Sequence, residues 1–185
     1  MSDCLLSIQG RGHAKGLFSF DELFYLLKSA ERLEDAKNVE EMIREVFKEH
    51  PDSSLRKKLD SGITELIDGK TKKALETFSD IVAAEPSYGE AWNKKATCHY
   101  MLGETDAAIE ASNKALETDP RNFQALAGIG LVQMDKVNDD KALLKAIDAF
   151  QQCLDLNPWS MISARLSVCI GRRTGLHSST NNKGE

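Results

Sequence analysis

The sequence predicts an all-α fold, a solenoid of antiparallel helix pairs with helical caps, on two observations. All four prolines, Pro51, Pro86, Pro120 and Pro158, follow a run in which apolar residues recur at three- and four-residue steps, as they do on an amphipathic helix. The steps between these prolines are 35, 34 and 38 residues. A fixed period of roughly 34 residues is typical of helical repeats, which stack because no single unit can bury its apolar face alone.

Composition indicates one domain of modest size. The chain has 185 residues, of which 41% are hydrophobic and 29% charged, enough for a single core. A net charge of -5 disfavours a nucleic-acid surface, which needs basic residues against the phosphates. The sequence contains no apolar stretch near the roughly 20 residues that span a bilayer, and residues 1–16 lack the apolar core of a secretory signal. We expect a cytoplasmic protein. The alternative is an organelle such as the plastid, since residues 1–16 are basic apart from Asp3.

The expected elements follow one another without a large gap. In chain order they are a flexible leader (1–18), an N-terminal helical pair (19–51), three repeats (52–86, 87–120 and 121–158), a capping helix (159–170) and a disordered tail (171–185).

The N-terminal pair is predicted from caps and periodicity. Ser19 and Glu22 form a capping-box pattern, so the first helix should run from about Phe20 to Ser29. Pro51 should end the second helix, because the residue before a proline is pushed out of the α region. The apolar positions of that second helix are Val39, Met42, Ile43, Val46 and Phe47. The pair is either a degenerate repeat or a packing cap.

The repeats are predicted from caps and turn glycines. Asp52 can cap the first repeat, and Gly69 and Gly103 suit the turns inside the first two repeats. The third repeat has four extra residues around Val137 to Leu144, with Asn138 and Asp139 as turn or cap residues. They form either a longer turn or an early start of the second helix, and the absence of a breaker favours the early start.

The end of the chain should hold one more helix. Ser160 can cap it, and Trp159 can pack back onto it. This helix would cover the last repeat, as solenoid ends require. From Gly171 onward polar residues dominate, which predicts disorder.

The middle unit resembles the tetratricopeptide repeat family. The residues that carry this resemblance are Trp92, Ala96, Gly103, Ala108, Ala115 and Pro120. The first unit agrees at Gly62, Gly69, Ala74, Phe78 and Pro86, and the third at Leu126, Gly130, Ala146, Phe150 and Pro158. The departures are Lys95 for leucine, Ser112 for an aromatic residue and Cys153 for alanine. The resemblance covers residues 54–158 well and 19–170 loosely, and it implies a right-handed α-solenoid.

In this family the first helix of each unit lines a concave groove that binds peptides. By register, the resemblance implies that the groove is lined by Leu59, Ile63, Asn93, Thr97, Tyr100, Met101, Gln124, Leu131 and Met134. One family branch holds acidic chaperone tails through Lys, Asn, Asn, Lys and Arg side chains. Those places are occupied here by Leu59, Ile63, Lys94, Gln124 and Gly128, so the carboxylate clamp should be absent. An apolar groove floor suits a partner's amphipathic helix or extended segment.

The sequence contains no complete motif for phosphate binding, dinucleotide binding or a metal site. Gly10, Gly12 and Gly16 lack the spacing of a phosphate loop, and Gly128 and Gly130 fall within a helix pattern rather than after a strand. The cysteines show no C-x-x-C pair and no nearby histidine, so reduced, buried thiols are expected at Cys4, Cys98, Cys153 and Cys169. A redox or zinc site would need distant cysteines to converge.

We therefore expect a non-enzymatic protein-interaction scaffold with no cofactor and no metal. Its partner would be a protein or peptide, with no nucleic acid and no membrane span. The alternative is a structural or self-assembling subunit whose groove is filled by its own N-terminal helices, and self-association remains open.

Overall fold

The computed structural model describes residues 18–136 and 139–175, and within these ranges the chain forms helices and no strand. The helices are α2 (Phe20–Ser29), α3 (Leu33–Lys48), α4 (Ser53–Ile67), α5 (Thr71–Ala84), α6 (Gly89–Met101), α7 (Thr105–Thr118), α8 (Phe123–Met134), α9 (Asp140–Leu156) and α10 (Ser163–Thr174). None of them is long and apolar enough to cross a membrane.

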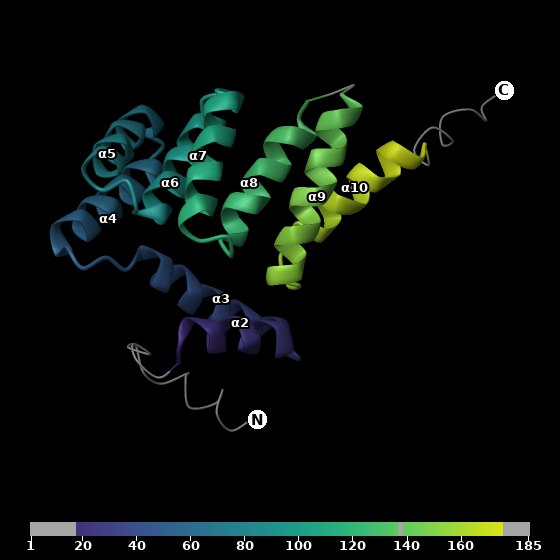
Figure 1. The fold of residues 1–185 in the computed structure, drawn as a ribbon, viewed down its shortest axis with the longest axis horizontal. Helices are drawn as coiled ribbons and strands as arrows, with labels where there is room; N and C mark the ends of the chain where they lie inside the picture. Colours follow the sequence, from purple (N-terminus) through teal and green to yellow (C-terminus); the bar gives the residue numbers. More distant parts are fainter. Residues whose placement is uncertain (1–17, 137–138, 176–185) are drawn as a thin grey trace.

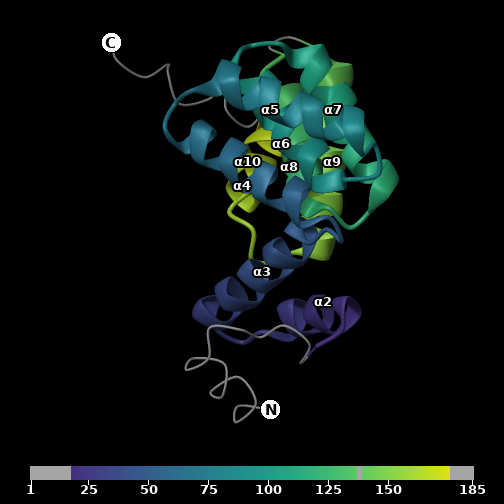
Figure 2. The ribbon, with the colours of Figure 1, turned by 90° about the vertical axis from the view of Figure 1, so that its left-hand side faces the viewer.

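The helices from α4 to α10 stack in a row (Figure 1). The pairs α4–α5, α6–α7 and α8–α9 correspond to the three predicted repeats, and α10 packs against α9 at the end of the row. Helices α2 and α3 lie beneath this row, and the view from its end shows the same separation (Figure 2). The prediction of an all-α helical repeat solenoid is confirmed.

Glycines form the turns inside the first two repeats. Gly69 and Gly103 have φ angles of 75° and 77°, in the left-handed region that only glycine adopts at little cost. The backbone N–H of Lys70 donates to the Glu65 carbonyl at 2.8 Å, and the pattern recurs after Gly103. These bonds satisfy carbonyls at the helix ends and reverse the chain sharply, so the second helix of each repeat packs back on the first.

In the first and third repeats, a glycine lets an aromatic ring lie against the neighbouring helix. A Cβ placed on Gly62 would lie 2.6 Å from Cε1 of Phe78, and one on Gly130 would lie 2.2 Å from Cε1 of Phe150. Real Cβ contacts essentially never fall below 3.0 Å, so each ring occupies the space of a missing side chain. Both Phe78 and Phe150 are fully buried.

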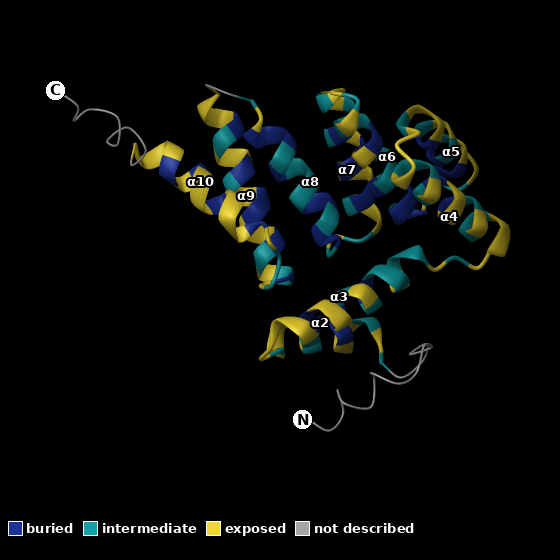
Figure 3. Ribbon diagram, turned by 180° about the vertical axis from the view of Figure 1, so that it is seen from behind, coloured by how far each residue is buried: buried dark blue, intermediate teal, exposed yellow. Residues whose placement is uncertain are grey.

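The middle repeat is packed with smaller side chains, and it separates two clusters of buried apolar residues. One cluster is centred on Phe78 in the first repeat, and the other joins the N-terminal pair to the third repeat and α10 around Phe150. Between them, the corresponding pair in the middle repeat is Ala96 and Ser112, both buried. Figure 3 shows buried positions along the facing sides of α6, α7 and α8.

The N-terminal pair lies along the edge of the solenoid that carries the linkers at the ends of the repeats. After α5, the Tyr88 hydroxyl donates to the Lys48 carbonyl at 2.5 Å. After α9, the Asn157 amide donates to Glu40 Oε2 at 3.0 Å. After α7, edge-to-face ring contacts join Phe20, Phe24, Phe47 and Phe123. Helix α3 is therefore attached at three successive linkers.

Several predicted boundaries agree with the structure. The reciprocal capping box of Ser19 and Glu22 is present, and α2 spans the predicted residues. Asp52 caps α4 by accepting from the Ser54 backbone N–H at 2.7 Å. Helix α3 ends at Lys48, before Pro51, as the proline predicts.

The predicted bounds of the capping helix were wrong. The helix was expected over 159–170 with Ser160 as its cap, whereas α10 runs from Ser163 to Thr174 and enters the predicted disordered tail. Residues after Asn157 first form a turn, in which the Asn157 side chain accepts from the Trp159 N–H at 3.1 Å. Cys169, in the second half of this helix, is buried in the core and supports the helix at this position. The helix ends at Gly175, whose φ of 70° lies in the left-handed region.

The third repeat takes up its extra residues mainly as a longer helix. Helix α9 begins at Asp140, six residues before Ala146, whereas α7 begins three residues before the matching Ala108. Asp139 caps this early start by accepting from the backbone N–H groups of Lys141 and Ala142 at 2.9 and 3.0 Å. The expected leader before residue 18, residues 137 and 138, and the tail after residue 175 lie outside the described residues.

Candidate binding groove

A pocket of about 460 Å³ opens between α6 and α8, with α7 at its base and α3 at one rim. Six of the nine residues predicted for the groove line it: Asn93, Thr97, Tyr100, Met101, Gln124 and Leu131. All six lie on α6 or α8, the first helices of the second and third repeats. The repeat register therefore selected residues that line this pocket.

The other three predicted groove residues do not line this pocket. Leu59 is fully buried and Ile63 is half-buried in the core of the first repeat. Met134 is only 6% exposed and packs in the cluster that includes Leu166 and Cys169 of α10. Arg172 of α10 also donates to the Met134 carbonyl at 3.2 Å. These side chains support the fold at their positions and do not contact the pocket.

Register reasoning missed the contribution of α3. Glu40 and Arg44 lie at the pocket rim, where the Arg44 guanidinium donates to Glu40 Oε1 through Nε at 3.2 Å. No repeat motif covers α3, so nothing in the periodicity could place these two residues. Residues from α7 were also missed: Ala108 and Ser112 form part of the pocket base. The one signal for them was the departure of Ser112 from the usual aromatic residue.

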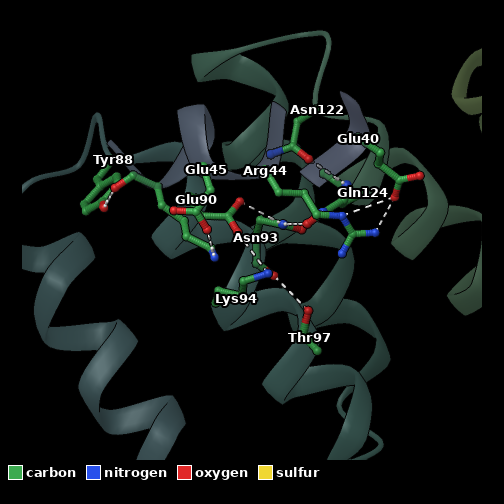
Figure 4. Close-up of polar contacts among 12 residues, drawn as sticks. Glu40, Arg44, Glu45, Tyr88, Glu90, Asn93, Lys94, Thr97, Asn122 and Gln124 are labelled. Carbon is green, nitrogen blue, oxygen red and sulfur yellow. Dashed lines mark hydrogen bonds and ion pairs between the residues drawn. The ribbon is translucent and has the colours of Figure 1, made fainter. Parts of the chain in front are cut away.

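A polar network holds the wall of the groove on α6 (Figure 4). Asn93 Nδ2 donates to Glu90 Oε2 and to Gln124 Oε1, each at 3.0 Å, so one amide joins α6 to α8. Glu90 is 3% exposed and also accepts an ion pair from Lys94 at 2.9 Å. Thr97 Oγ1 donates to the Asn93 carbonyl at 3.1 Å. The network orders these side chains on α6.

A second polar contact joins the C-terminal ends of α6 and α8. Tyr100 Oη donates to Asp135 Oδ2 at 2.8 Å, and this hydrogen bond is the main cause that raises the pKa of Tyr100. Beside it, the Met101 side chain is 55% exposed. An exposed methionine next to a fixed tyrosine is an adaptable apolar surface at the mouth of the pocket.

The pocket lining is apolar and close to neutral. Among the described residues that line it, the charged ones are Glu40 and Arg44, which pair with each other. The aliphatic lining residues are Ala96, Ala108, Ala127, Leu131 and Val132. This surface offers little to a highly charged ligand.

The described cysteines match the expectation of buried thiols, and Cys4 lies outside the described residues. Cys98, Cys153 and Cys169 are free and buried. Burial raises the pKa of Cys98 and of Cys153 to about 11, so both thiols are protonated and poorly nucleophilic at neutral pH. Within the described ranges, no three His, Cys, Asp or Glu side chains gather where they could hold a metal ion.

Sequence comparison identifies repeats in the middle of the chain. Residues 59–122 match the model of a tetratricopeptide repeat. A TPR repeat-containing protein of Rhizobium etli is 24% identical over 138 residues, which are 75% of this chain and 66% of that protein. The CTR9 homolog of Arabidopsis thaliana is 34% identical over 62 residues, only 6% of its length. The chain thus spans less than two thirds of these relatives.

Solved structures share the fold. The first TPR of Spaghetti (RPAP3), bound to the HSP90 peptide SRMEEVD, aligns with a TM-score of 0.61 at 17% identity, over 68% of this chain and 98% of that one. The Sgt2 TPR domain from Aspergillus fumigatus aligns with a TM-score of 0.62 at 17% identity, over 73% of this chain and 89% of that one. At this level of identity the similarity concerns the fold alone.

Proposed function

This chain is a tetratricopeptide-repeat protein, and from that premise we propose that it is a non-enzymatic scaffold that binds a helix or extended segment of a partner protein in the groove between α6 and α8. The observation that carries the proposal is the pocket itself. It is open, and six side chains chosen by repeat register line it.

The partner segment we propose is neutral and apolar, unlike the HSP90 peptide SRMEEVD to which the Spaghetti domain is bound. Three places of the carboxylate clamp support this choice. Leu59 is buried, Lys94 is already paired with Glu90, and Gly128 has no side chain. A carboxylate in this groove would lose its hydration without gaining the paired cations that such recognition needs.

The proposal contains no catalytic step. The described lining includes no histidine or cysteine that could serve as a nucleophile or its base. The tetratricopeptide fold generally serves protein interaction. We keep the cytoplasm as the proposed location, with an organelle such as the plastid as the alternative.

The alternative function is a self-assembling subunit whose groove is filled by its own N-terminal helices. The position of α2 and α3 favours the open groove, because they follow the linker edge and bring only Glu40 and Arg44 to the pocket rim. Self-association through other surfaces stays a separate question that sedimentation of the full chain would answer.

The proposed function is tested by blocking the groove from its exposed rim. In the double variant Thr97→Arg/Met101→Arg, two long cations project from positions that are exposed in the free protein. They should abolish capture of the partner from cell extracts, scored by mass spectrometry of the bound proteins, and leave the helical circular-dichroism spectrum unchanged. Met134 is unsuitable for this purpose, because truncation of a core side chain would also destabilise the fold.

The matched control makes the same change in net charge on another helix. Glu110→Gln/Asn113→Arg alters exposed residues of α7 that do not line the pocket, and it should capture the same partner as the wild type. Undiminished capture by the Thr97→Arg/Met101→Arg variant would refute the groove as the binding site.

A further inference from the structure

The middle repeat lacks the aromatic ring that fills the flanking repeats. In the first and third repeats a phenylalanine packs on a glycine of the partner helix, Phe78 on Gly62 and Phe150 on Gly130. The matching pair in the middle repeat is Ser112 on α7 and Ala96 on α6. The pair is smaller by nearly a whole aromatic ring, so this site has a space that the chain fills elsewhere with its own side chain.

The missing ring coincides with the base of the groove. Five small or branched residues form a recess there, which we call the socket: Ala96, Ala108, Ser112, Gly128 and Val132. A Cβ on Gly128 would meet only Ser112 Oγ, at 3.7 Å. The surface of α8 is therefore open at Gly128, whereas Phe150 covers it at Gly130. The socket therefore connects with the solvent-exposed part of the pocket.

The socket also contains a hydroxyl group. Ser112 is only 3% exposed as a residue, and it lines the pocket. Its Oγ is not among the described buried side-chain atoms that lack a partner, so it lies at the surface of the socket rather than in the core.

We propose that the partner segment inserts one aromatic side chain into the socket, in the place where Phe78 and Phe150 lie in the neighbouring repeats. This inference rests on the proposed function and adds the class of anchor residue. Charge complementarity supports an uncharged side chain, because the charged residues in the described part of the lining, Glu40 and Arg44, neutralise each other at the rim. A single buried aromatic anchor in a pocket is a common energetic centre of an interface.

The first test uses a small probe in place of the unknown partner. The probe is N-acetyl-phenylalanine methylamide, titrated into the ¹⁵N-labelled full chain, with N-acetyl-alanine methylamide as the matched control. We expect saturable shifts of the backbone amides of Ala96, Ser112 and Gly128 with the aromatic probe. The alanine probe should bind at least about ten-fold more weakly, because it buries far less apolar surface.

The matched variant fills the socket from within. Ala96→Gly/Ser112→Phe copies into the middle repeat the packing that Gly62 and Phe78 have in the first. It should keep the thermal unfolding midpoint at or above that of the wild type and abolish the shifts. If this variant fails to fold, Gly128→Leu closes the same recess from α8 and should abolish them as well. No saturable shift in the wild type, or unchanged shifts in the folded variants, would overturn the proposal.

The socket and the groove can fail separately. Partner capture that survives Ala96→Gly/Ser112→Phe but is lost in Thr97→Arg/Met101→Arg would overturn the socket and keep the groove. Loss of capture in both would support the socket. Capture that survives in every variant would overturn both proposals.

Discussion

The substitutions Gly130→Ala and Gly128→Ala add the same methyl group to the same helix, and their effects on stability should have opposite signs. On Gly130 the new Cβ would lie 2.2 Å from Cε1 and 2.3 Å from Cδ1 of Phe150. On Gly128 it would lie 3.7 Å from Ser112 Oγ, an ordinary van der Waals contact. The contrast isolates the role of close helix approach from the intrinsic preference for helix.

The magnitudes follow from two opposed terms. Alanine is favoured over glycine inside a helix by about 1 kcal/mol, and this gain applies at both positions. At position 130 the ring of Phe150 is fully buried and must move by more than about 1 Å to restore a normal carbon–carbon contact. Such overpacking typically costs about 1–3 kcal/mol, occasionally more. We expect Gly130→Ala to lower the free energy of unfolding by up to about 2 kcal/mol, and Gly128→Ala to raise it by up to about 1 kcal/mol.

The assay is urea unfolding of the two variants and the wild type, followed by circular dichroism at 222 nm, a wavelength chosen for helix content, with the transition midpoints compared at equal slope. A third variant, Gly130→Ala/Phe150→Leu, tests the cause. Relief of the clash should make the double variant more stable than the sum of its single changes predicts. If Gly130→Ala were as stabilising as Gly128→Ala, the packing of Phe150 against α8 would be refuted.

Three further outcomes follow from the polar and buried groups. Glu90→Ala should lower the free energy of unfolding by about 1–3 kcal/mol, because it removes the acceptor of Lys94 and one of the two acceptors of the Asn93 amide, and an undisturbed urea midpoint would contradict the network. Cys98 and Cys153 should resist a thiol reagent at pH 8 in the native protein and react quickly in denaturant, since burial raises both pKa values to about 11; equal labelling rates in the two states would be the contrary result. Hydrogen bonds from the backbone N–H groups of Ala142 and, to a smaller extent, Lys141 lower the pKa of Asp139 below its ordinary value of 3.8. The stability that this cap contributes is therefore complete above that value and is lost as the pH falls through the lower folded-state pKa, so Asp139→Asn should show a shallower loss of the thermal midpoint in acid.

Much of the local structure could be predicted from the chain alone. The capping box at Ser19, the glycine turn at Gly69 and the end of α3 before Pro51 depend on a few neighbouring residues. Such signals act through backbone dihedrals and short-range hydrogen bonds, which the residue types themselves restrict. The last helix was misplaced because its bounds depend on burial against the third repeat as well as on the local cap at Ser160.

The candidate site was predictable only where it follows the repeat. Register identified Asn93, Thr97 and Gln124 because the second and third repeats present the same helix face to the groove. It could not show that α10 buries Met134, or that α3 brings Arg44 to the rim, since these contacts come from elements outside the repeat pattern.

The sequence by itself determined the period, the helix pairs and the face that each first helix turns to the groove, because these depend on residues a few positions apart. Only the tertiary structure decided which part of that face stays open. The bond between Asn157 and Glu40, 117 residues apart, helps to hold α3 along the linker edge and away from the groove. Burial of apolar surface is non-directional and can be satisfied by any element of suitable shape, so its partners are chosen by the whole fold. In the middle repeat, that choice left the socket beside Ser112 without a ring of its own.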